Sequence, residues 1–300
     1  MRWPEQHASG PRILGIHARR LLRSLIARRE LAAVARHVRS AGNLQWVLLG
    51  NERSEWHRRF AHDVRAREVV RCDDGAADAV PVGSSPATSS YHKQPSPLRW
   101  LGWPGTSSEI KPDVIFSAYP RAMDGRSEGA VVIKNNYDVL RSRLRRPSNR
   151  SGSVWFVGQP FYTTSEASVR AFIAILAFVS RTFFGGKQLC YRAHPGEDMD
   201  VVQQLAAELR WDWAPFSQPI ELEVAESEIA PERMLTFFSS VFQTCHHIYG
   251  PAIPFDIIIP EPSFWPLTSV RTEPPVYRFF ERQGTAPNRL LHVPAAVFSS

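Results

Sequence analysis

The feature that most constrains the fold of this chain is a regular alternation of apolar strands with amphipathic helices. In the first third of the sequence, periodicity predicts a helix over residues 16–40, a strand over 43–49, a helix over 53–66 and a strand over 68–72. Alternation at a spacing of about twenty residues is typical of a parallel sheet with crossover helices. A ligand of such a sheet lies beyond the carboxyl ends of its strands. We therefore expect an α/β fold with its chemistry immediately after the strands.

The length of the chain indicates two lobes. At 300 residues it is too long for one small core and suits two lobes of about 150 residues each, which would enclose a cleft. Residues 141–152 are typical of a linker, so we expect one lobe over 1–145 and a second over 146–300. Residues 76–112 are rich in serine, proline, glycine and alanine and lack periodicity, so they are expected to form an irregular insertion in the first lobe.

The composition is that of a globular protein from a reducing compartment. Hydrophobic residues make up 43% of the chain and charged residues 22%, which excludes the disordered, fibrous and membrane-embedded classes. The three cysteines, Cys72, Cys190 and Cys245, are odd in number and far apart, which argues against a disulfide framework. The first residues do not have the pattern of a signal peptide. We therefore expect a cytoplasmic protein.

The formal net charge of +7 favours anionic partners. The basic residues are not interleaved with base-stacking aromatic residues as in a nucleic-acid-binding module, so no nucleic-acid partner is expected. The helix predicted over residues 16–40 is basic and amphipathic, and is either a surface helix of the first lobe or a peripheral contact with the inner face of the cytoplasmic membrane. The apolar run over 171–179 is too short to span a bilayer and predicts a buried helix.

The candidate catalytic residues of the first lobe are Asp73, Asp74 and Gly75, which directly follow the strand predicted over 68–72. Aspartate and glycine are also the residues that a tight turn favours, so a turn without chemistry is one interpretation. In the functional interpretation, backbone amides orient one carboxylate while the other accepts the proton of an incoming hydroxyl as general base. Gly75 would let that hydroxyl approach.

A second candidate is the pair His194 and Pro195, which follows a strand predicted over 187–192. The proline keeps the backbone of the histidine extended, so the imidazole is held rigidly at the end of the strand. There it can donate to a phosphate oxygen and protonate a departing phosphate, although a purely structural histidine is the alternative. No metal is expected, because His246 and His247 lack the ligand spacing of a known site.

Two further candidates in the second lobe suit a nucleotide. Ser239 and Ser240 precede a predicted helix, and hydroxyls with free amides at a helix start either bind a phosphate or serve only as a cap. Glu221 lies on a strand predicted over 220–224, where its carboxylate could accept from both hydroxyls of a ribose. The neighbouring Glu223 is the other candidate for this role, and either carboxylate could simply face solvent.

In their order, these motifs resemble those of the bacterial sialyltransferases of the GT-B fold. The first lobe contains VLLGNERS and VVRCDDG, and the second contains VWFVGQPF, YRAHPGED and IELEVAESEIAPERMLTFFSSVF. The resemblance spans residues 43–250 and is greatest for the polysialyltransferase-like and lipooligosaccharide sialyltransferase groups. It implies two Rossmann-like lobes whose parallel sheets face a central cleft, with the acceptor bound by the first lobe and the nucleotide donor by the second.

The resemblance also implies a reaction, the transfer of sialic acid from CMP-sialic acid to a cell-surface glycan acceptor, with inversion and without a metal or cofactor. Asp74 would be the general base, and His194 would bind the CMP phosphate and assist its departure. The other matching positions would bind substrate, and they are Asp73, Gly75, Gly158, Gln159, Pro195, Glu221, Ser239 and Ser240. Among them, the serines would hold the phosphate and Glu221 the ribose. Gly158 and Gln159 would lie beside the cytidine.

Two alternative functions stay open from the sequence. The chain could be another nucleotide-sugar glycosyltransferase of the same fold, or a relative that binds a glycan or a nucleotide without catalysis. The basic charge is compatible with each of them, because a nucleotide sugar is an anion. A preference for CMP over UDP would separate a sialyltransferase from other transferases, and release of CMP would separate an enzyme from a silent relative.

Overall fold

A computed structural model describes residues 29–50, 55–73, 110–120, 129–144, 149–150, 152–162, 165–185, 187–227, 229–283 and 288–298. These residues fall into two compact units, one holding the described residues up to Lys134 and the other those from Asn135 onward. The division comes earlier than the boundary expected at residue 145. The physical reason is that α4 (Asp138–Arg143) packs on α8 (Val241–Tyr249), where the Tyr137 ring stacks on His247 at a centroid distance of 5.7 Å.

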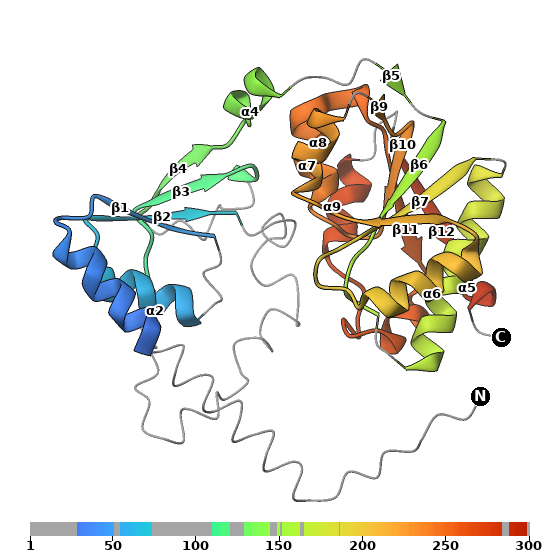
Figure 1. Cartoon of the computed structure of the whole chain (residues 1–300), viewed down its shortest axis with the longest axis horizontal. Helices are drawn as coiled ribbons and strands as arrows, with labels where there is room; N and C mark the ends of the chain where they lie inside the picture. Colours follow the sequence, from blue (N-terminus) through green and yellow to red (C-terminus); the bar gives the residue numbers. More distant parts are fainter. Residues whose placement is uncertain are drawn as a thin grey trace, which may run out of the picture. The chain divides into compact units, whose positions relative to one another are not determined.

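The first unit is built on a four-stranded sheet in which every neighbouring pair of strands is parallel. A helix, described over residues 29–40, precedes the first strand, and the strands follow the order of the chain (Figure 1). The elements are β1 (Trp46–Leu49), α2 (Glu55–Val64), β2 (Glu68–Cys72), β3 (Val114–Ser117) and β4 (Val131–Lys134). The predicted alternation of strands and helices is confirmed here for the described residues, while residues 16–28 of the first predicted helix lie outside them.

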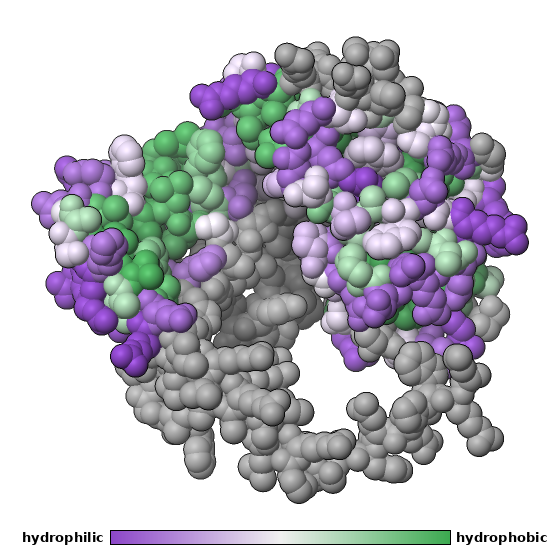
Figure 2. Space-filling view, in the orientation of Figure 1, coloured by the Kyte–Doolittle hydropathy of each residue, from purple (hydrophilic) through white to green (hydrophobic). Residues whose placement is uncertain are grey.

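The two faces of this sheet differ. Alternate residues of β1, Val47 and Leu49, are buried against Ala61 and Val64 of α2 and Ala35 of the preceding helix. The opposite face is apolar and exposed, as Figure 2 shows for the sheet of the first unit. It carries large side chains from three strands, namely Trp46, Leu48, Phe116, Val131 and Ile133. Since residues two apart share a face, the strand period alone produces this segregation.

The second unit is built on a six-stranded sheet, again with every neighbouring pair parallel. Its strands are β6 (Ser153–Val157), β7 (Gln188–Ala193), β8 (Asp212–Pro215), β10 (Arg233–Thr236), β11 (Phe255–Pro260) and β12 (Arg289–Val293). The spatial order is β12-β11-β10-β6-β7-β8. The chain therefore builds β7 and β8 outward on one side of β6 and then returns to add β10, β11 and β12 on the other, which is the strand order of a dinucleotide-binding fold.

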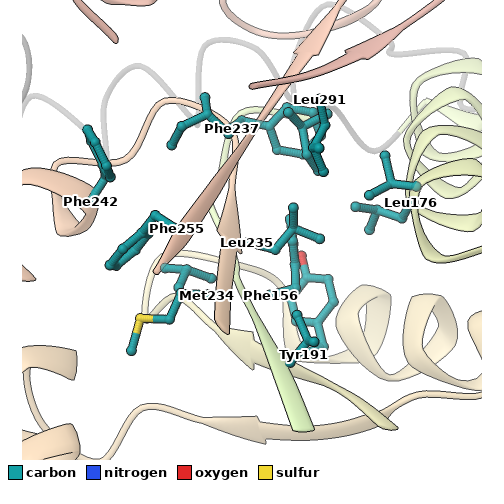
Figure 3. Packing of buried hydrophobic residues seen from close by; sticks show 14 of the residues in the cluster. Phe156, Leu176, Tyr191, Met234, Leu235, Phe237, Phe242, Phe255 and Leu291 are labelled. Carbon is teal, nitrogen blue, oxygen red and sulfur yellow. The ribbon is translucent and has the colours of Figure 1, made fainter. Parts of the chain in front are cut away.

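Helices cover both faces of the six-stranded sheet (Figure 1). On one face the Phe156 ring of β6 meets Phe172 of α5 at 6.1 Å, and on the other the Phe255 ring of β11 meets Phe242 of α8 at 5.5 Å. Figure 3 shows the core side chains that these layers enclose. The remaining elements are α5 (Glu166–Phe184), α6 (Met199–Leu209), α7 (Ile220–Glu226), α9 (Val276–Gln283), η4 (Gly250–Ala252), η5 (Pro262–Leu267), η6 (Ala295–Val297) and the short pair β5 (Asn149–Arg150) and β9 (Ile229–Ala230).

Helix α5 is long and apolar enough to cross a membrane by length and composition, but one of its faces lies in the core. Phe172, Ile175, Leu176 and Val179 are fully buried there. The buried helix predicted for residues 171–179 is therefore confirmed.

One predicted strand is wrong. Residues 220–224 belong to α7 rather than to a strand. Ile220 and Val224, four residues apart, share the buried face, as a helical period requires. Glu221 and Glu223 lie in the first turn, where carboxylates are favoured by the helix dipole. The alternating letters of IELEV had suggested a strand, but in so short a segment they fit both periods.

Candidate functional site

The candidate nucleotide site lies where the strand order reverses, between β6 and β10. In open parallel sheets this switch point opens a crevice at the carboxyl ends of the strands. Gly158 and Gln159 directly follow β6, and Ser239 and Ser240 come shortly after β10. The sequence therefore supplies candidate residues from both sides of the switch point.

Gln159 ties the two sides together. Its side-chain Oε1 accepts hydrogen bonds from the backbone N–H of Phe238 at 3.1 Å and from the Thr236 hydroxyl at 3.2 Å. The side chain is buried, so these bonds replace those it would make with water. Gln159 thus fixes the segment that leads from β10 into α8. The expectation that it lies beside a cytidine stays a prediction.

Ser239 and Ser240 start α8 in different ways. The Ser239 hydroxyl accepts a hydrogen bond from the backbone N–H of Val241 at 3.2 Å, while Ser240 is the N-cap residue and makes no capping bond with its side chain. The backbone carbonyl of Ser240 accepts from the amides of Gln243 and Thr244. A helix start combines unpaired amides with the positive end of the helix dipole, which suits an anionic group. The Ser240 hydroxyl is placed to add a donor to such a group.

His194 follows β7 and begins a tight turn. The backbone N–H of Glu197 donates to the His194 carbonyl at 3.0 Å, with Pro195 and Gly196 between them. The backbone N–H of Gly196 donates to Nδ1 of the imidazole at 3.0 Å. Because an amide N–H can only donate, Nδ1 must hold a lone pair, and the ring proton of the neutral histidine is on Nε2. Burial lowers the pKa of His194, which also favours the neutral form.

Glu197 was not among the predicted site residues, although it lies in the same turn. Its carboxylate accepts from the Tyr191 hydroxyl at 2.7 Å and from the backbone N–H of His194 at 2.7 Å. Burial raises the pKa of Glu197, and these hydrogen bonds oppose the rise. The signal that could have found it is its spacing, since a carboxylate three residues after His194 closes a turn through proline and glycine.

The two glutamates of α7 have different surroundings. Burial raises the pKa of Glu221, whose carboxyl is contacted by the side chain of Thr244 in the first turns of α8. Glu221 therefore stays a candidate for binding a ribose, from a helix instead of the predicted strand. Glu223 instead forms an ion pair with Arg192 of β7, whose guanidinium lies 4.8 Å from the Trp155 ring centroid. This pairing commits Glu223 to packing α7 on the sheet.

Among the acidic candidates of the first unit, the structure describes Asp73. Its Oδ2 accepts a hydrogen bond from the backbone N–H of Ala118 at 2.5 Å, at the end of the neighbouring strand β3. A backbone amide thus orients this carboxylate. Asp74 and Gly75 lie outside the described residues, so the general base stays a prediction. In the described part of the chain, no three side chains of histidine, cysteine, aspartate or glutamate gather as a metal site would require.

The structure thus brings six of the predicted residues to one edge of a single sheet. Three segments supply them, which follow β6, β7 and β10, and the residues are Gly158, Gln159, His194, Pro195, Ser239 and Ser240. Glu221 reaches the same α8 turn through Thr244. The arrangement can present donors to an anion from an imidazole, a hydroxyl and a helix start. A phosphate is the group that such a set suits best.

Two parallel α/β units, one with its strand order reversing at a candidate anion site, define a fold of the GT-B type built from Rossmann-like lobes. Over 94% of its length the chain superposes on 73% of a glutamine-to-alanine variant of Os79 from O. sativa in complex with UDP, with a TM-score of 0.50 and 14% sequence identity. A threonine-to-valine variant of Os79, also in complex with UDP, gives a TM-score of 0.48 at 15% identity over 94% of this chain and 72% of that one.

A glycosyl transferase family 9 protein from Veillonella parvula gives a TM-score of 0.35 at 11% identity, over 88% of this chain and 66% of that one. No family model and no curated protein matches the sequence. At these identities the similarity establishes the fold, and the function has to be argued from the site.

Proposed function

We propose that this protein is a glycosyltransferase that binds a nucleotide-sugar donor on its second unit. The observation that carries the proposal is the convergence of anion-binding groups at the switch point of the six-stranded sheet. His194 offers an Nε2–H donor, Ser240 offers a hydroxyl free of any capping role, and α8 offers its amino-terminal amides. A transferase must stabilise the phosphate that leaves with the nucleotide, and preorganised donors serve that step.

In its specific form, the proposal is transfer of sialic acid from CMP-sialic acid to a glycan acceptor. The bond between the anomeric carbon and the phosphate oxygen breaks, and the phosphate keeps the electron pair. The acceptor oxygen attacks the opposite face of the sugar, which inverts the configuration, and Asp74 takes its proton as general base. The resemblance of DDG, HP and SS to the sialyltransferase motifs supports this form, as does the neutral donor at His194.

A second candidate is a transferase that uses a UDP-sugar. The specific observation in its favour is that Os79, which shares the fold, was seen in complex with UDP. The two candidates differ in the number of phosphates that the site must hold. A site with one imidazole and one helix start suits a monophosphate, whereas a diphosphate needs donors for a second charged group.

Calorimetry with CMP, UDP and GDP tests the proposal. We expect CMP to bind more tightly than either diphosphate, and Ser240→Ala to weaken CMP binding by about tenfold, since one hydrogen bond to a charged group is lost. Ser142→Ala, which removes an exposed hydroxyl from α4, is the matched control and should leave binding unchanged. Tighter binding of UDP would favour the second candidate. Equal, negligible binding of all three nucleotides would refute a donor site at this edge.

A further inference from the structure

Glu197 stands out because it lies beside the proposed site and yet has no part in the reaction as proposed. It is 8% exposed, although charged side chains are rarely buried without a reason. Each of its two oxygens has a different partner: Oε1 accepts from the Tyr191 hydroxyl and Oε2 from the backbone N–H of His194. Both partners belong to one stretch, the end of β7 and the residue that follows it. The carboxylate therefore holds the point at which the chain leaves the strand.

Glu197 also contacts the segment after β6. Its carboxyl interacts with the backbone amide of Gln159. Gly158 approaches it so closely that a Cβ atom on this glycine would overlap Oε2 of Glu197. One carboxylate thus lies between the residues that follow β6 and those that follow β7, which are neighbouring strands. Any change in its position would move both segments.

The same turn sets the protonation pattern of the histidine. The carbonyl of His194 accepts from the Glu197 amide, its amide donates to the Glu197 carboxylate, and its Nδ1 accepts from the Gly196 amide. The backbone of His194 is thus fixed at both polar groups and the ring at one nitrogen. Nε2 is left as the ring donor that can reach a ligand. Without the carboxylate, the His194 amide would lose its acceptor and the turn would lose one of its three bonds.

We infer that Glu197 is a positioning residue that fixes the turn after β7, so that His194 presents Nε2–H to the phosphate of the donor. The inference rests on the proposed function for the identity of that phosphate. It does not depend on that function for the geometry of the turn. Glu197 touches no reacting atom, so its effect must pass through His194.

The first test is the tautomer of His194 in the unmodified protein. Two-dimensional NMR of protein with 15N-labelled histidine, assigned by comparison with His194→Gln, should show His194 as the Nε2–H tautomer above neutral pH. Its pKa should lie below the ordinary histidine value of about 6.5, because burial disfavours the charged ring. A His194 that carries its proton on Nδ1 would overturn the inference, whatever any variant does.

The second test compares three variants. Glu197→Ala should give a mixture of His194 tautomers and weaken CMP binding by about 10- to 100-fold, the scale of a misplaced group. Glu197→Gln keeps an oxygen for the His194 amide and should restore most of the loss. Ile175→Val, a truncation in the buried face of α5, lowers stability without touching the turn and should change neither readout.

Each outcome of this comparison decides something. If folded Glu197→Ala keeps the tautomer and the CMP affinity of the unmodified protein, Glu197 has only a structural role and the inference fails. If Ile175→Val changes the tautomer of His194 as much as Glu197→Ala does, the effect is general loss of stability and the inference fails. If the unmodified protein binds no CMP, the proposed function fails, while the tautomer and the titration still test the role of Glu197.

Discussion

Position 158 requires a glycine because buried groups are packed closely around it. Its backbone N–H donates to the carbonyl of Arg192 at 2.8 Å, which continues the pairing of β6 with β7 beyond the strand. A Cβ atom there would overlap the carboxylate of Glu197 and would lie 2.9 Å from a ring carbon of Tyr191. Both of these groups are buried and hydrogen-bonded to each other, so neither can move aside freely.

Gly158→Ala is therefore expected to destabilise the protein by about 1–3 kcal/mol, the usual cost of overpacking a rigid site. Denaturant unfolding of the purified variant measures this. Gly152→Ala is the matched control, because a Cβ atom at Gly152 meets nothing within 4 Å. Equal losses of stability in the two variants would contradict the explanation by steric overlap.

At the residue scale, the sequence predicts which residues are candidates for the site better than it predicts the contacts that those residues make. His194 follows a predicted strand, and Ser239 and Ser240 precede a predicted helix, because the end of an apolar run and the start of a helical period are local signals. The role of Glu197 depends on Tyr191 and Gly158, which are brought to it only when β6 and β7 pair. No local pattern carries that information, so the residue was missed.

Helix α5 shows how an element boundary depends on its cap. Ser165 is the N-cap residue, and its hydroxyl accepts from the backbone N–H of Ser168 at 3.3 Å. The sequence also offers Thr163 with Glu166 three residues later, the spacing of a capping box. The structure places Glu166 as the first residue of the helix, too early for that role, although a carboxylate there still complements the helix dipole.

Ser165→Ala should therefore cost about 1 kcal/mol of stability, the typical value of a lost N-cap. Thermal unfolding of the variant measures the loss, and Thr163→Ala is the control that separates the two caps. A larger effect of Thr163→Ala than of Ser165→Ala would indicate that Thr163 and Glu166 form a capping box instead.

At the element scale most of the prediction is confirmed. The strands β1, β2 and β7 and the helices α2, α5 and α8 form where periodicity predicts them, although their ends differ by a few residues. Long or strongly apolar segments are identified well, because burial requires one face to repeat. Helix α7 is one exception, since two glutamates between apolar residues alternate as a strand would. Strand β10 (Arg233–Thr236) is another, because Pro231 had indicated the start of a helix there. The packing of α7 on α8 favours the helix over a strand, and this contact joins segments that are apart in the sequence.

The whole molecule divides its candidate residues between its two units. The nucleotide candidates lie in the second unit, which has its own core, while the acidic candidate Asp73 lies in the first unit and Asp74 follows it in the sequence. Donor binding and proton removal should therefore be separable.

We expect the segment 135–300, produced alone, to fold and to bind CMP as the whole chain does, but to transfer nothing.

We expect Asp74→Ala in the whole chain to keep CMP binding and to lower the release of CMP from CMP-sialic acid by about 100-fold or more, the contribution of a general base. Calorimetry and a CMP-release assay measure the two properties. Full turnover of Asp74→Ala would place the base elsewhere, and failure of the folded segment to bind CMP would show that the first unit contributes to the donor site.

The division into two units was predicted from length, but its position was not. The segment over 141–152 has the composition of a linker, yet α4 already belongs to the second unit because Tyr137 and Leu140 pack against its core. The composition of a linker reflects solubility and flexibility. The boundary between two units instead depends on the core against which each side chain packs.

Because one face of the first sheet is apolar and exposed, the two units should differ in solubility when each is produced separately. Helices cover both faces of the sheet in the second unit, and the side of this unit that Figure 2 shows carries mainly polar residues, so the unit is suited to transfer into another protein. The first unit would carry Trp46, Leu48 and Val131, each at least 60% exposed, into any new setting. A fragment that ends at Lys134 would therefore come out of solution at concentrations where the second unit stays monomeric.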